Sequence, residues 1–262
     1  MTAIVQLSDP HVRVGPRDVD AARALAAAVE AVRRLEPRPD AVLLTGDLAD
    51  DGSARSYDRV RELLAPLTTP VLALPGNRDD RDAIRALFAP PDAADAAGAV
   101  ARAGDPVQYA VRVGDVRVVL CDTTRTGFAD GDFGPARRAW LDAELLADPR
   151  TPTIVAMHHP PIAIGMPGLD ALGLPPGDRA ALTALVARHP QVRRVVCGHV
   201  HRAVSGVLGG CVVQVCPSTY LQAVLQLGAE GFELAPEPPA FVVHALVDGD
   251  VVSHVQPVAR RA

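Results

Sequence analysis

Side chains that bind divalent metal ions gather in five short polar clusters along this chain. Each cluster follows an apolar run with the composition of a β-strand, and together they hold five of the eight histidines. The clusters are Asp9-Pro-His11, Gly46-Asp47-Leu-Ala-Asp50, Gly76-Asn77-Arg78-Asp79, His158-His159-Pro160-Pro161 and Gly198-His199-Val-His201. Imidazole, carboxylate and carboxamide groups without a thiolate suit two borderline divalent ions better than a closed structural zinc site. Such a mixture predicts the chemistry of a binuclear phosphoester hydrolase.

Each of these residues also has a simple structural explanation when it is taken alone. Asp9 is a common turn or cap residue, Asp47 after Gly46 fits a strand-to-loop turn, and Asn77 fits a left-handed turn position. Short motifs match by chance often enough that none of them decides the function. The ordered occurrence of all five clusters favours the metal-site interpretation.

Composition predicts one enzyme domain over residues 1–262, with a β-rich part from about residue 203. The chain has 262 residues, of which 48% are hydrophobic, enough to bury a large core. The formal net charge of −5 argues against binding to a nucleic-acid polymer. All 26 basic residues are arginine, so a lysine-based mechanism is excluded.

The sequence shows no sign of a membrane or secreted protein. No apolar run reaches the length of a membrane span, and the first residues lack the basic start and apolar stretch of a signal peptide. The four cysteines, without C-x-x-C spacing, lie in apolar runs and are expected to be buried thiols. We therefore expect a cytoplasmic protein without a membrane partner.

Hydrophobic periodicity predicts alternating strands and helices in the first half and mostly strands after residue 203. The predicted strands are Ala3–Leu7, Ala41–Thr45, Val71–Leu74, Val107–Val113, Val116–Cys121, Thr153–Met157, Arg194–Cys197, Val204–Leu208, Val212–Val215, Ala240–Val247 and Val251–Val255. The predicted helices are Val19–Leu35, a segment capped by Ser53 that ends at Leu64, Arg81–Phe88, Pro135–Leu146 and Arg179–Ala187. The β-α-β-α-β start implies an α/β fold with a largely parallel sheet, and the β-rich C-terminal half suggests a second, mixed sheet packed against it. All five clusters then lie at the carboxyl ends of strands, where such folds bind ligands.

In order and spacing, the clusters resemble the calcineurin-like metallophosphoesterase superfamily, whose pattern is D-x-H, G-D-x-x-D, G-N-H-D, an H-x-P-like strand end and G-H-x-H. The resemblance covers nearly the whole chain and implies two packed mixed β-sheets flanked by helices, a four-layer αββα sandwich. Narrower strings resemble the bacterial class III cyclic-nucleotide phosphodiesterases and the related glycerophosphodiesterases. These strings are Leu74-Pro-Gly-Asn77, His158-His-Pro-Pro161, Gly198-His-Val-His-Arg202 and Cys216-Pro-Ser-Thr219.

The resemblance implies a specific division of the ligands between two divalent ions of Mn, Fe, Co or Zn. One ion would lie between Asp9, His11, Asp47 and His201, and the other between Asp47, Asn77, His158 and His199, with Asp47 bridging. Two ions bring four positive charges, of which two carboxylates and one bridging hydroxide neutralise three. The remaining positive charge suits a monoanionic phosphodiester, which the bridging hydroxide would attack.

Residues beside the predicted ligands have less certain functions. His159 is expected on the other side of the strand from His158, in the substrate pocket or behind the ligands. Asp50 is expected to organise its loop and Asp79 to orient its neighbour. His189, His244 and His254 lie outside every cluster and are expected to be surface or packing residues.

The main departure from the family pattern is Arg78, because most relatives have histidine there, where it contacts the phosphate and can protonate the leaving group. A guanidinium stays charged throughout the working pH range, so Arg78 cannot act as a general acid. It can bind a phosphoryl oxygen and stabilise transition-state charge. The proton would then come from His159 or from a metal-bound water.

The segment from residue 162 to residue 176 is unusually apolar for a loop. Because it directly follows the His158 cluster, we expect it near the metals. It would form either a lid that packs against a nucleobase or the interface of a homodimer.

Together these features predict a metal-dependent phosphodiesterase with Asp47, Arg78 and His159 in catalytic roles and the last two binding substrate. A 3′,5′-cyclic nucleotide such as cAMP is the expected substrate, with a glycerophosphodiester or another small diester as the alternative. A regulatory metal-binding protein with weak turnover, and a protein phosphatase or nuclease of the same superfamily, are further alternatives. The short chain without basic patches speaks against a nuclease.

Overall fold

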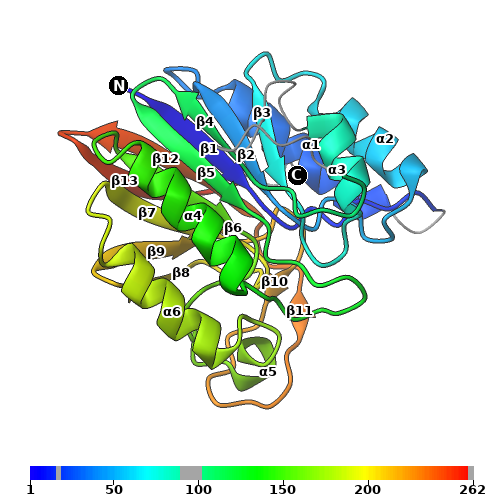
Figure 1. Ribbon diagram of the computed structural model, residues 1–262. Coiled ribbons are helices and arrows are strands. Elements are labelled where there is room, and N and C mark those ends of the chain that lie inside the picture. The colour runs from blue at the N-terminus through cyan, green and yellow to red at the C-terminus, as the bar shows by residue number, and fades with distance from the viewer. Residues whose placement is uncertain (16–18, 89–101, 259–262) are drawn as a thin grey trace.

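A computed structural model describes residues 1–15, 19–88 and 102–258 (Figure 1). The helices are α1 (Val19–Arg33), α2 (Ala54–Leu64), α3 (Arg81–Phe88), α4 (Pro135–Ala147), α5 (Pro167–Asp170) and α6 (Pro176–Val186). The strands are β1 (Ala3–Leu7), β2 (Ala41–Thr45), β3 (Val71–Leu74), β4 (Tyr109–Val113), β5 (Val116–Cys121), β6 (Thr153–Met157), β7 (Val192–Cys197), β8 (Val204–Leu208), β9 (Cys211–Val215), β10 (Gln222–Ala223), β11 (Leu234–Ala235), β12 (Ala240–Val247) and β13 (Asp250–Pro257). The predicted elements are all present, with bounds that shift by up to three residues. Short α5, β10 and β11 were not predicted, because they are too brief to show a period.

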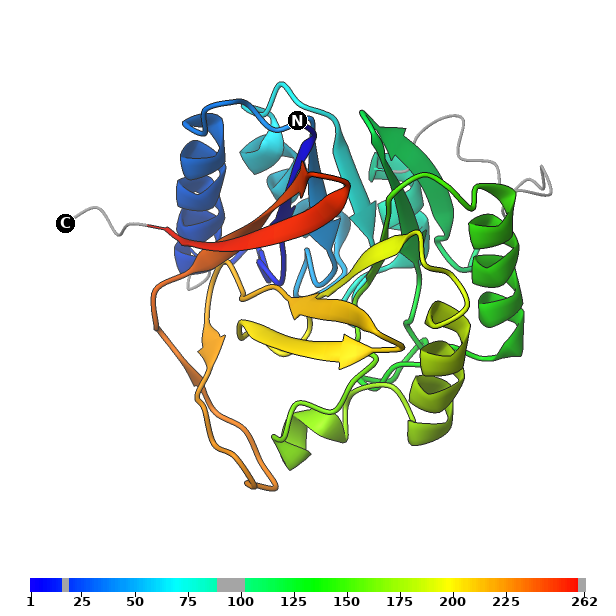
Figure 2. The ribbon, with the colours of Figure 1, turned by 90° about the vertical axis from the view of Figure 1, so that its left-hand side faces the viewer.

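Two sheets lie face to face between two layers of helices (Figures 1 and 2). The first sheet has the strand order β13-β12-β1-β2-β3 and the second has the order β4-β5-β6-β7-β9-β8. Strands β1, β2 and β3 run parallel, as do β5, β6, β7 and β9, whereas β4, β8, β12 and β13 are antiparallel to their neighbours. Both sheets are therefore mixed, and the predicted four-layer α/β architecture is confirmed.

The C-terminal strands were predicted to build the second sheet, but the last hairpin, β12 and β13, belongs to the first sheet. Strand β12 pairs antiparallel with β1, with Ala3 opposite Ala245 and Gln6 opposite Val242. The reason is that β1 is paired with β2 on one side only, and β12 covers its other backbone edge. The hairpin thereby places residues from the end of the chain beside the strand that leads to Asp9.

The buried apolar side chains form two clusters, one on each face of the second sheet. The first fills the space between the sheets and beneath α1, α2 and α3, where Leu25, Val29 and Val32 form a buried stripe along α1. The second lies beneath α4 and α6. The four cysteines are buried free thiols, as predicted. Among the described residues, no helix is long and apolar enough to cross a membrane.

The apolar segment 162–176 is folded onto the protein. Its side chains Met166, Leu169 and Leu174 are buried in the second apolar cluster. The carboxylate of Asp170 closes the segment by accepting hydrogen bonds from the backbone N–H groups of Ile164 at 2.7 Å and Gly165 at 3.1 Å. These three side chains are therefore core residues and do not form an exposed surface for a base or a second subunit, whereas the homodimer itself stays a prediction. Core packing, rather than a binding surface, explains their apolar character.

Candidate metal centre

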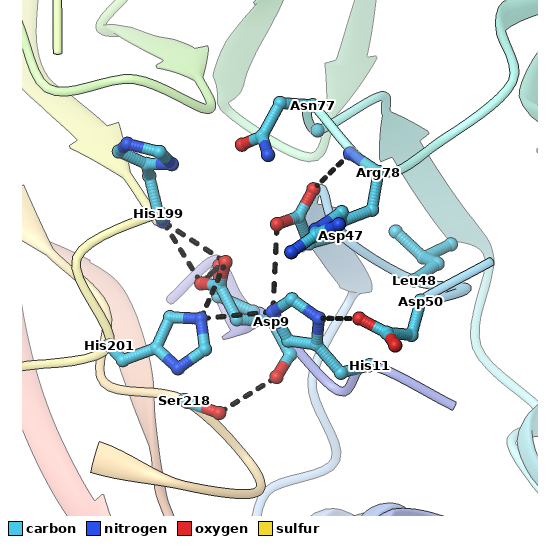
Figure 3. A network of polar contacts seen from close by, with 12 residues as sticks. Asp9, His11, Asp47, Leu48, Asp50, Asn77, Arg78, His199, His201 and Ser218 are labelled. Carbon is cyan, nitrogen blue, oxygen red and sulfur yellow. Dashed lines mark hydrogen bonds and ion pairs between the residues drawn. The ribbon is translucent and has the colours of Figure 1, made fainter. Parts of the chain in front are cut away.

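The five polar clusters meet at one edge of the two sheets. Strands β1, β2, β3, β6 and β7 end just before these clusters, and all five strands point their carboxyl ends the same way. Figure 3 shows Asp9, Asp47, Asn77, His199 and His201 turned toward a common centre. Segments far apart in the sequence thus contribute single side chains to one site.

The backbone at this site is strained. Six non-glycine residues of the described chain have a positive φ, and five of them are predicted metal ligands. These five are Asp9 (φ 51°), His11 (46°), Asp47 (52°), His199 (72°) and His201 (49°). Such a conformation costs about 1 kcal/mol for each residue with a side chain. Strain gathered on the side chains that converge is typical of a functional site.

Two glycines allow the loops to approach one another. A Cβ atom on Gly198 would collide with the Ser8 hydroxyl and the Asp9 carboxylate, and one on Gly76 would collide with Asp47. The glycines of the G-N and G-H motifs are therefore explained by close packing of backbone against the carboxylates.

The first set of converging atoms belongs to Asp9, His11 and His201. The two Nε2 atoms of His11 and His201 lie 3.0 Å apart. Nε2 of His201 is 3.6 Å from Oδ1 of Asp9. In both rings the other nitrogen donates a hydrogen bond: Nδ1 of His11 to Asp50 at 3.0 Å, and Nδ1 of His201 to the carbonyl of Leu221 at 3.0 Å. These bonds turn both Nε2 lone pairs toward the same point, as in histidines that bind a metal.

The second set is built around His158. Its Nδ1 donates to the carbonyl of Thr45 at 2.8 Å, so Nε2 faces the centre. Nε2 lies 3.1 Å from Oδ1 of Asn77 and 3.2 Å from Nδ1 of His199. A neutral oxygen and two imidazole nitrogens at these separations form a ligand set suited to a borderline divalent cation.

Asp47 lies between the two sets. Its Oδ2 is 3.5 Å from Nε2 of His11, and its Oδ1 is 3.6 Å from Nε2 of His158. Oδ1 also accepts a hydrogen bond from the backbone N–H of Arg78 at 2.8 Å. One carboxylate oxygen therefore faces each set, which is the arrangement required of a bridging ligand.

The electrostatics of the site also suit a cation. Burial, together with the neighbouring histidines, lowers the pKa of His199 to about 3, and burial lowers the pKa of His201. Burial also acts to lower the pKa of His11, but the Asp50 hydrogen bond and the Asp47 and Asp9 charges outweigh it and raise the pKa to about 9. Metal binding needs neutral imidazoles. A divalent ion at the first set would thus replace the proton on His11.

Asp50 and Asp79 support the ligands from behind. Asp50 accepts the Nδ1 hydrogen bond of His11, a more specific contact than the predicted loop organisation. Asp79 accepts from the backbone N–H groups of Leu48 at 3.1 Å and Gly76 at 2.9 Å, and from the Tyr57 hydroxyl at 3.0 Å. Asp79 therefore joins the Asp47 loop to the Asn77 loop.

His159 is more enclosed than a residue that meets substrate. It is fully buried, its Nδ1 is 2.8 Å from the Thr123 hydroxyl, and its Nε2 is 3.1 Å from the carbonyl of Ala129. Burial and the adjacent histidine charges hold its pKa well below the usual value. Its ring centroid is 4.5 Å from that of His199. In this position both ring nitrogens are engaged, which argues against the predicted role as proton donor.

Arg78 has an exposed side chain and follows Asn77 on the same loop (Figure 3). Its charge contributes to a lowered pKa of Asp50, after the larger effect of the His11 hydrogen bond. The predicted contact of its guanidinium with an anionic substrate stays a prediction.

Two residues at the site, Ser8 and Thr45, were not predicted from the sequence. The Ser8 hydroxyl donates to Oδ2 of Asp9 at 2.5 Å, and the Thr45 carbonyl orients His158. The available signal was weak: a polar residue at the end of an otherwise apolar buried strand.

Comparison with known proteins agrees with this geometry. The family model of calcineurin-like phosphoesterases matches residues 2–203. A 3′,5′-cyclic adenosine monophosphate phosphodiesterase of Pseudomonas aeruginosa is 33% identical over 223 residues, covering 84% of this chain and 76% of that protein. A glycerophosphodiester phosphodiesterase of Enterobacter lignolyticus is 30% identical over 269 residues, covering 99% and 92%.

Among solved structures, a purple acid phosphatase from yellow lupin seeds matches with a TM-score of 0.65 at 14% identity, covering 98% of this chain and 51% of that chain. This match shows the fold alone. The family match and the clustered histidine and aspartate side chains identify a metal-binding phosphodiester hydrolase. The chain belongs to the calcineurin-like phosphoesterase family.

Proposed function

We propose that the protein hydrolyses a small phosphodiester with two divalent ions, and that its substrate is a 3′,5′-cyclic nucleotide such as cAMP. The observation that supports a binuclear site most directly is the position of Asp47, with one oxygen toward each set of converging ligands. Asp9, His11 and His201 would hold one ion, and Asn77, His158 and His199 the other. Mn, Fe, Co and Zn all accept such ligands.

Two divalent ions at this centre would neutralise phosphate charge and supply a nucleophilic water at neutral pH. The protein's own residues fix the geometry. Asp50, Leu221 and Thr45 orient the three imidazoles, and Asp79 fixes the separation of the Asp47 and Asn77 loops. These contacts act before substrate arrives, so little reorganisation is needed in the transition state.

Arg78 is assigned to the phosphate of the substrate. Its guanidinium carries a fixed positive charge and several donors, which match the oxygens of a phosphodiester. It cannot supply a proton to the leaving group. His159 is assigned to packing behind His199 rather than to proton transfer, because both of its ring nitrogens are engaged.

The choice of substrate class is supported by the relatives. The Pseudomonas protein is named for cyclic AMP and the Enterobacter protein for glycerophosphodiesters, so both substrates are candidates. The net charge of −5 makes a polyanionic polymer a poor substrate. A glycerophosphodiester remains the alternative.

The experiment is a diester panel assayed with the metal-reconstituted protein. Metal-free protein receives Mn, Fe(II), Co or Zn, and the turnover of bis-p-nitrophenyl phosphate, cAMP, cGMP and glycerophosphocholine is compared with chelated protein. We expect metal-dependent hydrolysis with the highest kcat/KM for a cyclic nucleotide. A higher value for glycerophosphocholine would support the alternative substrate. Tight metal binding without hydrolysis of any diester would instead indicate a regulatory metal-binding protein.

A further inference from the structure

A continuous chain of hydrogen bonds crosses the first sheet and ends on a predicted metal ligand. It links polar side chains on the neighbouring strands β13, β12, β1 and β2, of which the last three are otherwise largely apolar. Its members, in order, are Ser253 of β13, His244 of β12, Gln6 of β1, Thr45 of β2, and Ser8, which directly follows β1 and contacts Asp9. We call these five residues before Asp9 the cross-sheet chain.

Strand register places these side chains on the face of the sheet that lies against the second sheet. His244 is directly opposite Ser253 in one strand pair and opposite Ile4 in the other. Gln6 is two residues beyond Ile4, so both point to the same face. Gln6 also donates to the carbonyl of Cys197 in the second sheet at 2.9 Å. The chain therefore runs between the sheets, where Gln6 is fully buried, and Ser253 at its outer end is half-buried.

The contact with Cys197 determines the direction of the hydrogen bonds made by Gln6. A carbonyl can only accept, so the amide nitrogen of Gln6 faces Cys197, and the same nitrogen donates to the Thr45 hydroxyl at 2.9 Å. The amide oxygen of Gln6 must then accept from Nε2 of His244 at 3.0 Å. Burial keeps His244 neutral by lowering its pKa to about 3. Its Nδ1 therefore accepts from the Ser253 hydroxyl at 2.8 Å.

The other end of the chain is determined in the same way. The Ser8 hydroxyl lies 2.5 Å from Oδ2 of Asp9, and a carboxylate can only accept, so Ser8 donates to Asp9. Ser8 has one hydrogen, and its oxygen is left to accept from the Thr45 hydroxyl at 2.8 Å. All five bonds consequently point toward Asp9.

This polarity has a consequence for Asp9. Oδ2 receives the Ser8 hydroxyl at 2.5 Å, and Oδ1 lies toward His201. The backbone N–H of His199 is shared by both oxygens, at 3.0 Å from Oδ2 and 3.2 Å from Oδ1, so the Ser8 hydroxyl is what distinguishes Oδ2. The Ser8 hydroxyl has a competing acceptor, the Thr45 carbonyl at 3.5 Å. Donation from the Thr45 side chain occupies the oxygen of Ser8 and helps to keep its hydrogen on Asp9.

We propose that the cross-sheet chain positions Asp9 so that it presents Oδ1 alone to a divalent cation, and thereby sets the affinity of the Asp9, His11 and His201 set. The inference rests on the metal centre of the proposed function and extends it to residues that do not touch the metal or substrate. Supporting groups behind a ligand commonly change metal affinity by about 10- to 100-fold. The effect should be largest for Ser8 and smaller for members farther along the chain.

The test is manganese(II) binding to the full chain, followed by electron paramagnetic resonance of the free ion, with metal-free melting temperature as a second readout. Ser8→Ala should weaken one of two sites by about 10- to 100-fold. Thr45→Val, which keeps the side-chain shape, should weaken the same site by a smaller factor. Thr45→Ser should keep wild-type affinity, because it retains the hydroxyl.

Matched controls separate positioning from general packing. Ser56→Ala and Thr153→Val remove fully buried hydroxyls that bond to Ser53 and to the Thr151 carbonyl, respectively. They should leave both manganese sites unchanged. Wild-type affinity in Ser8→Ala and Thr45→Val would overturn the inference, and so would equal weakening of both sites in proportion to a lower melting temperature. If the wild-type protein binds none of Mn, Fe(II), Co and Zn, the proposed function fails as well, whereas two normal sites in both variants would reject the inference alone.

Discussion

The Nε2 atoms of His11 and His201 face each other at 3.0 Å, while Nδ1 of His11 is held by Asp50. Two imidazole nitrogens at this distance need a shared proton or cation between them. The high pKa of His11, about 9, indicates that a proton lies between the two nitrogens in the metal-free protein. The pair is therefore prepared for a metal ion by the groups behind it.

Asp50 should consequently affect metal affinity without binding the metal. We expect Asp50→Ala to lower the affinity for one of the two ions by about tenfold, because the His11 ring loses the acceptor that orients it. Isothermal titration with zinc measures both affinities. Asp51→Ala removes the neighbouring carboxylate, which pairs with Arg13, and should bind both ions normally. Unchanged zinc binding in Asp50→Ala would show that His11 is oriented without it.

Asp47 is the ligand predicted to serve both ions. Asp47→Ala should lower metal-dependent hydrolysis of bis-p-nitrophenyl phosphate by more than about a hundredfold. The control is Asp58→Ala, which removes an exposed carboxylate on α2 and should be fully active. Near-normal turnover with two ions bound to Asp47→Ala would refute the bridging assignment.

Asn77 contributes the one neutral side-chain oxygen to the predicted ligand set. Asn77→Ala should weaken binding of the ion that His158 and His199 also hold. Binding of the ion held by Asp9, His11 and His201 should not change. Metal analysis after dialysis should give about one ion per chain, compared with two in wild type. Two tightly held ions in the variant would mean that Asn77 only shapes the turn.

Because Arg78 cannot donate a proton, the rate of hydrolysis should depend strongly on the pKa of the leaving group. Phenolates leave unaided near neutral pH, whereas sugar and glycerol alkoxides need a proton or a metal. Arg78→His should raise turnover selectively for alkoxide leaving groups and add an acidic-side pKa to the rate profile. Arg78→Ala should slow both classes, because the phosphate contact is lost.

The measurement is the dependence of rate on leaving-group pKa in wild type and both Arg78 variants. A steeper slope in wild type than in Arg78→His supports the assignment. The same slope in all three proteins would place proton donation elsewhere.

His244 should make the folded state sensitive to acid. Its pKa is about 3 in the folded protein, because burial and the charge of Arg194 disfavour the proton, and about 6.5 when unfolded. Between these values the unfolded chain binds the extra proton, so stability present above pH 6.5 is lost as the pH falls. The contribution of His244 to this loss is about 1.4 kcal/mol per pH unit.

Urea unfolding of metal-free protein between pH 4.5 and pH 7 checks this expectation. His244→Gln keeps a donor and an acceptor but does not titrate, so its stability should fall less steeply in acid than that of wild type. The buried histidines of the metal centre are present in both proteins, and the difference isolates His244. Parallel curves would show that His244 accepts a proton in the folded state.

The alternating strands and helices and the five polar clusters could be predicted from the sequence, because hydrophobic periodicity and short motifs are local properties. The carboxyl-end rule for parallel strands was enough to predict that Asp9, Asp47 and Asn77 would lie near His158 and His199. The alternation of side chains along a strand predicted that His158, which directly follows β6, and His159 point to different sides. These conclusions need only the order of residues along the chain.

The distant groups that orient the predicted ligands could not be predicted, because they meet the ligands only in the folded chain. Strand β12 pairs with β1 because an open sheet edge needs a partner, and that pairing brings His244 to Gln6 across more than two hundred residues. The apolar character of Met166 and Leu169 predicted a binding surface, but both side chains are buried beneath the second sheet in the folded chain. Hydrogen-bond direction and side-chain burial depend on contacts between segments far apart in sequence, and no local pattern contains that information.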